Sequence, residues 1–236
     1  MSTLAQLRTR VLQLLLDTGS AIYPSDLVDE SLRQALHDYS QVRPLQMETV
    51  VTLPGDGREI ALNGISELLE VTNVWWPYDS AATSETWPPN QVRGWHVYWD
   101  DAQAVLFLDQ LEGAQPQMDD EVRVWYTTIQ KVEGMDSAAA TTVRIDHETG
   151  LCLGAAGYAA LSRVVDLVET AGTDLYAMAL QATWGNAKLR EFRRWLETLR
   201  AREVRSGTPA WGYGWSLDKW DNRSASYPGA DGGIGE

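Results

Sequence analysis

The sequence predicts an α+β protein in which N- and C-terminal helices form one bundle, with an inserted antiparallel β-domain that is a sandwich or an open barrel. Apolar residues recur at steps of three and four before residue 45 and again after residue 146, which is the period of amphipathic helices. Between these stretches apolar and polar residues alternate, and Gly, Pro and Asp separate the alternating runs, as in strands joined by turns. The chain thus divides into a helical hairpin (1–45), an acidic β-domain (46–145), C-terminal helices that complete the bundle (146–205) and a tail (206–236).

The hairpin contains two predicted helices. The first covers residues 3–18 with Ser2 or Thr3 as its cap, and the second begins at Ser25 as N-cap and ends before Pro44. The apolar faces consist of Leu4, Leu7, Val11, Leu14 and Leu15 in the first helix and of Val28, Leu32, Ala35, Leu36 and Tyr39 in the second. Both faces need a partner, so we expect the hairpin to pack on the C-terminal helices.

Six strands are predicted in the β-domain. The segments 47–53 and 58–62 flank the sequence PGDG, which predicts a hairpin, and the sequence WDDAQ (99–103) predicts a turn between two later strands. The other four strands are expected over 68–76, 93–99, 104–110 and 121–132, with Pro77, Pro88, Pro89 and Pro116 between the runs.

Two further helices follow. The first, over residues 147–170, carries small residues that permit close helix contact, namely Gly154, Ala155, Ala156, Gly157, Ala159 and Ala160. The last, capped by Thr173, has a seam at alternating steps of three and four formed by Leu175, Met178, Ala182, Gly185, Leu189, Phe192, Leu196 and Leu199.

Composition excludes several classes of protein. A net charge of −14 argues against wrapping of a phosphate backbone by the whole protein. A single cysteine, Cys152, excludes an intrachain disulfide framework, and a reducing compartment fits. The first residues lack the uninterrupted apolar stretch of a signal peptide, and no apolar run of 18 residues is present, so no membrane span is expected.

Charge is unevenly distributed. Residues 46–150 carry −13, whereas residues 186–205 carry +4. In a monomer this is a dipolar surface, but in a symmetric ring a basic helix end could meet an acidic neighbour. We therefore assign contact with a neighbouring subunit to the last helix, through Arg190, Arg193, Arg194, Trp195, Arg200 and Arg202.

The sequence contains little that indicates catalysis. No nucleophile-elbow, P-loop, dinucleotide-binding or zinc-protease motif is present, and we expect no catalytic, cofactor-binding or metal site. His37, His96 and His147 are scattered and are interpreted as structural, and Cys152 as a buried inert thiol. The acidic pairs near 100 and 120 are interpreted as turn residues rather than Ca²⁺ ligands. A hydrolase that uses acidic residues remains an alternative.

Tryptophan is unusually frequent, with eleven Trp against two Phe. In the strands we expect a core role for Trp75, Trp76, Trp95, Trp99 and Trp125. A sugar-binding platform and a surface between subunits are the alternatives. Trp184 and Trp195 lie off the seam of the last helix, which indicates a second packing partner for that helix.

The tail is rich in Gly, Ser and Pro but carries five large aromatic residues. We expect these to dock on a partner: Trp211, Tyr213, Trp215, Trp220 and Tyr227. The alternative is a flap folded back on its own domain.

The order of these segments resembles the head–tail connector (adaptor, or head-completion) proteins of tailed bacteriophages. The similarity lies in TLAQLRTRVLQLLLD, followed by YPSDLVDESLRQALHDY, in DEVRVWYT (120–127) and in the Ala-rich and Arg-rich helices that follow, and covers roughly residues 3–205. The matching positions in the hairpin are Asp17, Asp26, Leu27, Leu32, Ala35 and Leu36. The large β-domain departs from the smallest, nearly all-helical members.

The resemblance implies a structural virion protein rather than an enzyme. Such proteins form a ring, commonly of twelve copies, below the portal protein in the neck of the particle. They extend the DNA channel without specific DNA binding, and the tail terminator or another neck protein attaches to them. The chain would be made in the host cytoplasm, without a cofactor or a membrane. Another neck or tail component, such as a tail terminator, or a sugar-contacting receptor-binding β-module is the alternative.

Overall fold

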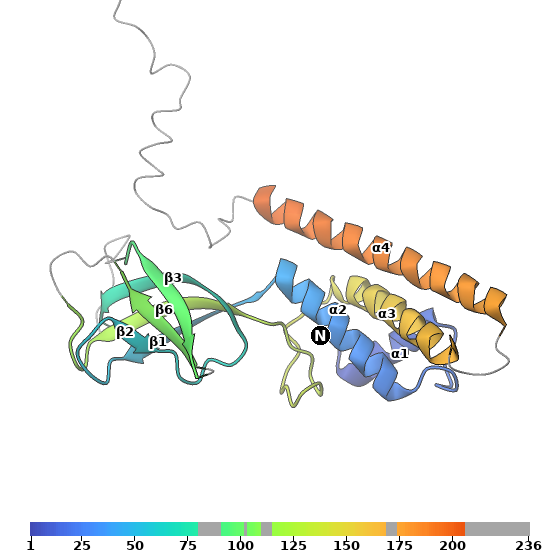
Figure 1. Cartoon of the computed structure of the whole chain (residues 1–236), viewed down its shortest axis with the longest axis horizontal. Coiled ribbons are helices and arrows are strands. Elements are labelled where there is room, and N and C mark those ends of the chain that lie inside the picture. The colour runs from blue at the N-terminus through green and yellow to red at the C-terminus, as the bar shows by residue number, and fades with distance from the viewer. Residues whose placement is uncertain (80–90, 102, 110–114, 169–173, 206–236) are drawn as a thin grey trace, which may run out of the picture. The chain divides into compact units, whose positions relative to one another are not determined.

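The computed structural model describes residues 1–79, 91–101, 103–109, 115–168 and 174–205, which form two compact units. The helical unit comprises Met1–Gln46 and the described residues from Thr128 onward, and the β-unit comprises Met47–Thr127. The α+β class with a β-region inserted between N- and C-terminal helices is as predicted (Figure 1).

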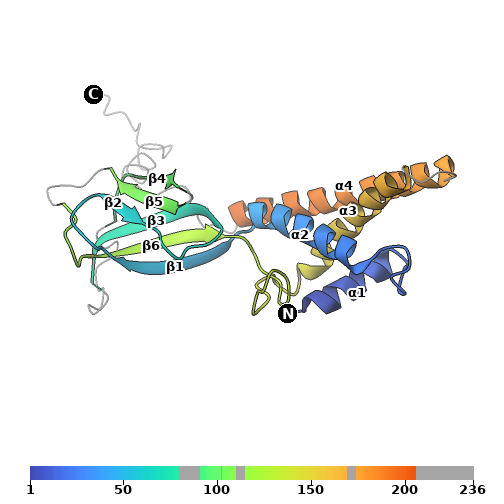
Figure 2. The ribbon, with the colours of Figure 1, turned by 60° about the horizontal axis from the view of Figure 1, so that its bottom comes forward.

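The helical unit contains α1 (Leu4–Leu14), α2 (Ser25–Val42), α3 (Glu148–Val168) and α4 (Leu175–Arg205). Helix α3 is central, because it contacts α1, α2 and α4 (Figures 1 and 2). The buried core draws on all four helices and on the segment 129–147 that leads into α3. The predicted packing of the hairpin on the C-terminal helices is therefore confirmed.

The connection between α1 and α2 is built around Asp17. Helix α1 ends at Leu14, four residues earlier than predicted, and the buried carboxylate of Asp17 then accepts hydrogen bonds from the backbone N–H groups of Ala21, Ile22 and Tyr23. The N-cap of α2 is Pro24 rather than the predicted Ser25, because Pro24 already has an extended backbone and Ser25 is the first helical residue.

Close packing of α3 on α4 depends on glycines. A β-carbon at Gly150 would lie 2.6 Å from the Trp195 ring, one at Gly154 would lie 2.8 Å from Phe192, and one at Gly157 would lie 2.9 Å from Leu189. These glycines follow one another at steps of four and three, so they form one face of α3. The prediction that small residues of this helix permit close helix contact is confirmed at Gly154 and Gly157.

Helix α3 is long and apolar enough to cross a membrane by length and composition only, with a mean hydropathy of 1.2 over Glu148–Leu167. Core helices of soluble proteins also pass this test, and 44% of the segment is buried against the other helices.

The β-unit contains six strands in two three-stranded sheets. The strands are β1 (Leu45–Thr52), β2 (Glu59–Ala61), β3 (Leu68–Tyr78), β4 (Trp95–Asp100), β5 (Gln103–Leu108) and β6 (Glu121–Thr128). Their orders are β1-β6-β3 and β2-β5-β4, and apolar side chains from both sheets enclose one core (Figure 2). The first and last strands, β1 and β6, are neighbours in one sheet. The two ends of the inserted β-region therefore lie side by side.

The predicted turn at WDDAQ is confirmed, because β4 and β5 pair antiparallel with Asp100 opposite Gln103. The hairpin predicted over 47–62 is wrong, since β1 and β2 lie in different sheets. Backbone groups around the PGDG turn bond elsewhere: Leu53 N–H donates to the carbonyl of Asp120, and Gly57 N–H to that of Pro116. Pro77, expected between strands, lies inside β3 at the edge of its sheet.

Candidate functional site

The exposed side of α4 carries a row of arginines. Arg190, Arg193, Arg194 and Arg200 are all exposed. On a helix of 3.6 residues per turn they fall within roughly a third of the circumference. The structure therefore brings these four predicted contact residues onto one surface, while the side chain of Arg202 lies outside the described residues.

An open groove runs between α3 and α4 beside this row. Leu161 and Leu189 supply the aliphatic part of its lining, and Tyr158, Arg190 and Arg193 line it as well. Thr183 and Asn186 complete the lining. The groove thus combines apolar side chains with two guanidinium groups.

Tyr158 is a groove residue that is hydrogen-bonded to another helix. Its hydroxyl donates a hydrogen bond to Asp38 at 2.5 Å, and burial, followed by this carboxylate, raises the pKa of Tyr158 to about 12. Tyr158 therefore stays protonated, and Asp38 is engaged with it. Arg193 lies next to the same hydroxyl, whereas Arg190 has no ion-pair partner within the described part of the chain.

Trp195, the sixth predicted contact residue, is largely used by the core. Its ring stacks on Tyr39 with centroids 5.9 Å apart, packs edge-on to His147 at 5.6 Å and lies against Gly150. The Tyr39 hydroxyl is 2.8 Å from Nδ1 of His147, so this histidine has a structural role, as predicted. The chain's own α2 is thus one packing partner of Trp195, and its contact with a neighbouring subunit stays a prediction.

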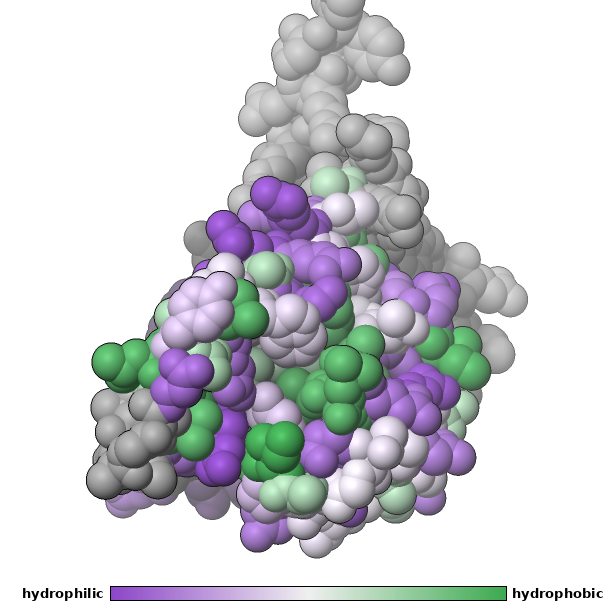
Figure 3. Space-filling view, turned by 90° about the vertical axis from the view of Figure 1, so that its right-hand side faces the viewer, coloured by the Kyte–Doolittle hydropathy of each residue, from purple (hydrophilic) through white to green (hydrophobic). Residues whose placement is uncertain are grey.

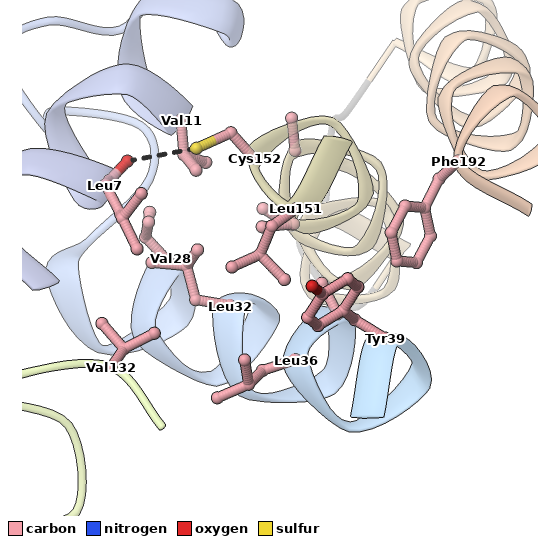
Figure 4. Packing of buried hydrophobic residues seen from close by; sticks show 14 of the residues in the cluster. Leu7, Val11, Val28, Leu32, Leu36, Tyr39, Val132, Leu151, Cys152 and Phe192 are labelled. Carbon is pink, nitrogen blue, oxygen red and sulfur yellow. Dashed lines mark hydrogen bonds between the residues drawn. The ribbon is translucent and has the colours of Figure 1, made fainter. Parts of the chain in front are cut away.

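The other buried functional groups are also structural. Burial raises the pKa of the Cys152 thiol to about 12, and the sulfur lies 4.0 Å from the Leu7 carbonyl oxygen (Figure 4). This agrees with the predicted inert thiol. Figure 4 shows Cys152 surrounded by the apolar core that includes Val11 and Leu151.

The buried carboxylate of Glu148 is a feature that sequence analysis missed. It is fully buried at the start of α3, where it accepts hydrogen bonds from the backbone N–H and the hydroxyl of Ser2 and from Arg10, all at 2.7 Å. Burial favours the neutral acid, but the hydrogen bonds from Ser2 and Arg10 outweigh it and lower the pKa of Glu148. The sequence signal that could have identified Glu148 was its position in the first turn of a helix, where the helix dipole favours an acidic side chain.

The helical unit also exposes apolar side chains where α4 begins. Leu175, Tyr176 and Leu180 are 78%, 76% and 62% exposed. Figure 3 shows apolar and charged patches side by side at this end of the unit. Leu175, predicted as the first residue of the apolar seam, therefore faces solvent, and the buried seam begins at Met178.

Most tryptophans of the β-unit are packed, as predicted for a core role. Trp75 and Trp76 are buried, Trp95 packs on the core, and Trp125 lies 4.3 Å from Trp75 between ring centroids. The exception is Trp99, which is 61% exposed at the β4–β5 turn.

The β4–β5 turn also carries two acidic residues. Asp100 and Asp101 are exposed, and among the residues that the structure describes no side chain forms a hydrogen bond or an ion pair with either carboxylate. The backbone of Asp101 has φ 42°, a left-handed conformation that Asp and Asn adopt more readily than most residues. Together with Trp99, these residues form a protruding turn that is both aromatic and acidic, here called the acidic turn.

No arrangement typical of a hydrolase is found in the described parts of the chain. The groove on the β-unit between β3 and β4 contains one carboxylate, Glu70, and the α3–α4 groove contains none in its lining. Where carboxyl pKa values depart from normal they are lowered, as for Asp136 beside Arg33 and Asp146 beside Arg144. A general acid needs the opposite shift. No group of three or more metal-ligating side chains occurs within these parts either.

The predicted docking residues of the tail, Trp211, Tyr213, Trp215, Trp220 and Tyr227, lie outside the described residues.

The chain resembles a solved structure, whereas no protein-family model and no curated protein matches it. A similar solved structure is described as "Neck of empty GTA particle computed with C6 symmetry"; it is 21% identical over 77% of this chain and 87% of the other, with a TM-score of 0.29.

Proposed function

We propose that this chain is a structural virion protein, a head–tail connector of a phage-like particle. It forms a homo-oligomeric ring, of twelve copies in the expected case, below the portal protein in the neck. The ring extends the channel through which packaged DNA passes without specific binding, and it offers an attachment surface to a tail terminator or another neck protein. In this role the chain is not an enzyme.

The observation that carries the proposal is the agreement between the residues that resemble connector proteins and those that build the hairpin. Asp17 organises the turn between α1 and α2 through three backbone hydrogen bonds. Leu32, Ala35 and Leu36 are buried in the core that α2 shares with α3. The resemblance therefore lies in the positions that determine how the hairpin packs.

The surface of α4 supports assembly with other copies. Four exposed arginines lie in one row on a chain whose net charge is −14, so the attractive partner for this row within a homo-oligomer is an acidic surface of a neighbouring copy. A ring made this way repeats one heterologous contact around its axis.

Removal of the gene from the genetic element that encodes this chain tests the proposal. We expect heads that package DNA but carry no tail, and we expect purified protein to restore tail attachment when added to such heads. Electron microscopy of the particles measures both results. Tailed particles formed in the absence of the chain would overturn the proposal.

A second candidate, a sugar-contacting module, is favoured by one observation. Trp99 is 61% exposed and lies with Trp95, Glu70 and His96 along the groove between β3 and β4. Exposed aromatic rings beside polar groups are suited to stacking on sugars. Glycan-array binding by the wild-type chain that is lost in Trp99→Ala would support this candidate, and an array without binding would remove it.

A further inference from the structure

We propose that the acidic turn of one copy, residues 99–101, inserts into the α3–α4 groove of a second copy and forms the repeating contact of the assembly. This inference deepens the proposed function and rests on it, because it supposes that copies of the chain assemble. The acidic turn lies on the β-unit of the chain, and the α3–α4 groove lies on the helical unit.

The two surfaces match in their apolar parts. The acidic turn projects one large ring, Trp99, which is 61% exposed. The groove offers Leu161 and Leu189 in its lining, together with the ring of Tyr158. An exposed Trp and a groove with apolar side chains in its lining are the kind of anchor and pocket that dominate the energetics of protein interfaces.

The surfaces also match in charge. Asp100 and Asp101 follow Trp99 in the turn, and no side chain of the described structure bonds their carboxylates, while Arg190 and Arg193 line the groove. The lining residues of the groove include no carboxylate, and Asp38, which accepts a hydrogen bond from the Tyr158 hydroxyl, is already engaged. The groove is therefore a cationic site, and a carboxylate and a guanidinium can form paired hydrogen bonds in it.

The wider charge distribution favours the same partner. Met47–Thr127, which includes the acidic turn, contains 14 acidic and three basic residues, whereas residues 186–205, which include the groove arginines, carry +4. A contact between these surfaces of different copies joins opposite charges. Contacts that would join β-unit to β-unit are opposed by repulsion.

The turn and the groove are different surfaces, and each copy has one of each. When each copy gives its turn to the next copy and receives the turn of the previous one, the contact is heterologous and repeats around the axis of a ring, as the proposed function requires. A reciprocal exchange of turns would instead close a two-fold dimer, and sedimentation velocity distinguishes the two by the size of the assembly.

Charge reversal on each side tests the contact. Arg190→Glu/Arg193→Glu changes the groove, and Asp100→Lys/Asp101→Asn changes the turn, where Asn retains the tolerance of the left-handed backbone at 101. In each variant alone like charges meet, and we expect the dissociation constant for self-association to rise about tenfold or more, equivalent to about 1.4 kcal/mol. In an equimolar mixture both kinds of contact again join opposite charges, so association should recover.

Sedimentation velocity across a concentration series measures these dissociation constants. The control is Ala177→Glu/Ala179→Glu, which adds negative charge at exposed positions of α4 outside both the groove and the row of arginines and should leave the dissociation constant nearer to that of the wild type. Trp99→Ala should weaken association without changing the melting temperature, which shows that its effect is on the contact and not on the fold.

Three results would overturn the contact: variants that associate like the wild type, a mixture that does not recover, or a control that weakens association as much as the groove variant. These results are separate from the test of the proposed function. Heads that lose their tails without this chain, together with a charge reversal that has no effect, would leave the connector role standing and place the contact elsewhere. Tailed particles formed without the chain would reject the connector role whatever the charge reversal gives.

Discussion

The backbone N–H and the hydroxyl of Ser2 both donate hydrogen bonds, at 2.7 Å, to the fully buried carboxylate of Glu148. The two residues are 146 positions apart, so the bonds join the start of the chain to the start of α3. Arg10 of α1 supplies the countercharge. The contact fixes the N-terminal hairpin to the central helix by polar as well as apolar packing.

Glu148→Gln should destabilise the helical unit by about 1–3 kcal/mol, because it leaves buried donors without a charged acceptor. The pKa of Glu148 is lowered from its usual value of 4.5, so its contribution is fully present above that pH and disappears as the pH falls through the folded-state pKa. The difference in unfolding free energy between wild type and variant should thus be largest at neutral pH and shrink in acid. Urea unfolding at several pH values measures it. The control is Asp146→Asn, an exposed carboxylate nearby; an equal effect there would contradict the prediction.

Gly154→Val should loosen the contact between α3 and α4. A β-carbon at this position would lie 2.8 Å from the Phe192 ring, which is itself fully buried and has little room to move. Overpacking of this kind costs about 1–3 kcal/mol. Thermal unfolding followed by circular dichroism measures the loss. Gly19→Val is the control because nothing lies within 4 Å of the added β-carbon. Unchanged stability of Gly154→Val would show that the helices can separate without cost.

Self-association of the purified chain should be weak in dilute, low-salt buffer and stronger near 0.15 M salt. A charge of −14 on every copy opposes assembly, and a Debye length of about 8 Å at that ionic strength screens this long-range repulsion more than ion pairs at contact distance. Light scattering across a salt series measures the effect. A ring that is stable in dilute, low-salt buffer without any partner would contradict the prediction.

Deletion of residues 206–236 should leave the remaining chain folded and block its incorporation into particles. In the alternating segment 211–215, Trp211, Tyr213 and Trp215 fall on one side of an extended chain, with glycines opposite, which suits a docking peptide. The melting temperature and the amount of truncated protein in purified particles are the two measurements. Normal incorporation with a lowered melting temperature would instead favour the alternative of a flap on the chain's own core.

The sequence by itself determined the local structure of this protein. Helical periods located all four helices, and the small residues of α3 indicated where another helix could approach, because period and side-chain size are properties of a single segment. The turn between Trp99 and Gln103 was equally local, since the two strands it joins are adjacent in the chain. The excess of basic residues near the end of α4 was likewise evident from the composition of that segment alone.

Only the tertiary structure decided which distant segments meet. It placed β1 beside β6 rather than β2, turned Trp195 onto Tyr39, and buried Glu148 against Ser2. Each of these contacts joins residues far apart in sequence, and its energy depends on packing and desolvation that no local pattern records. For the same reason the groove between α3 and α4 emerged only from the packed helices, although the arginines beside it were identifiable in the sequence.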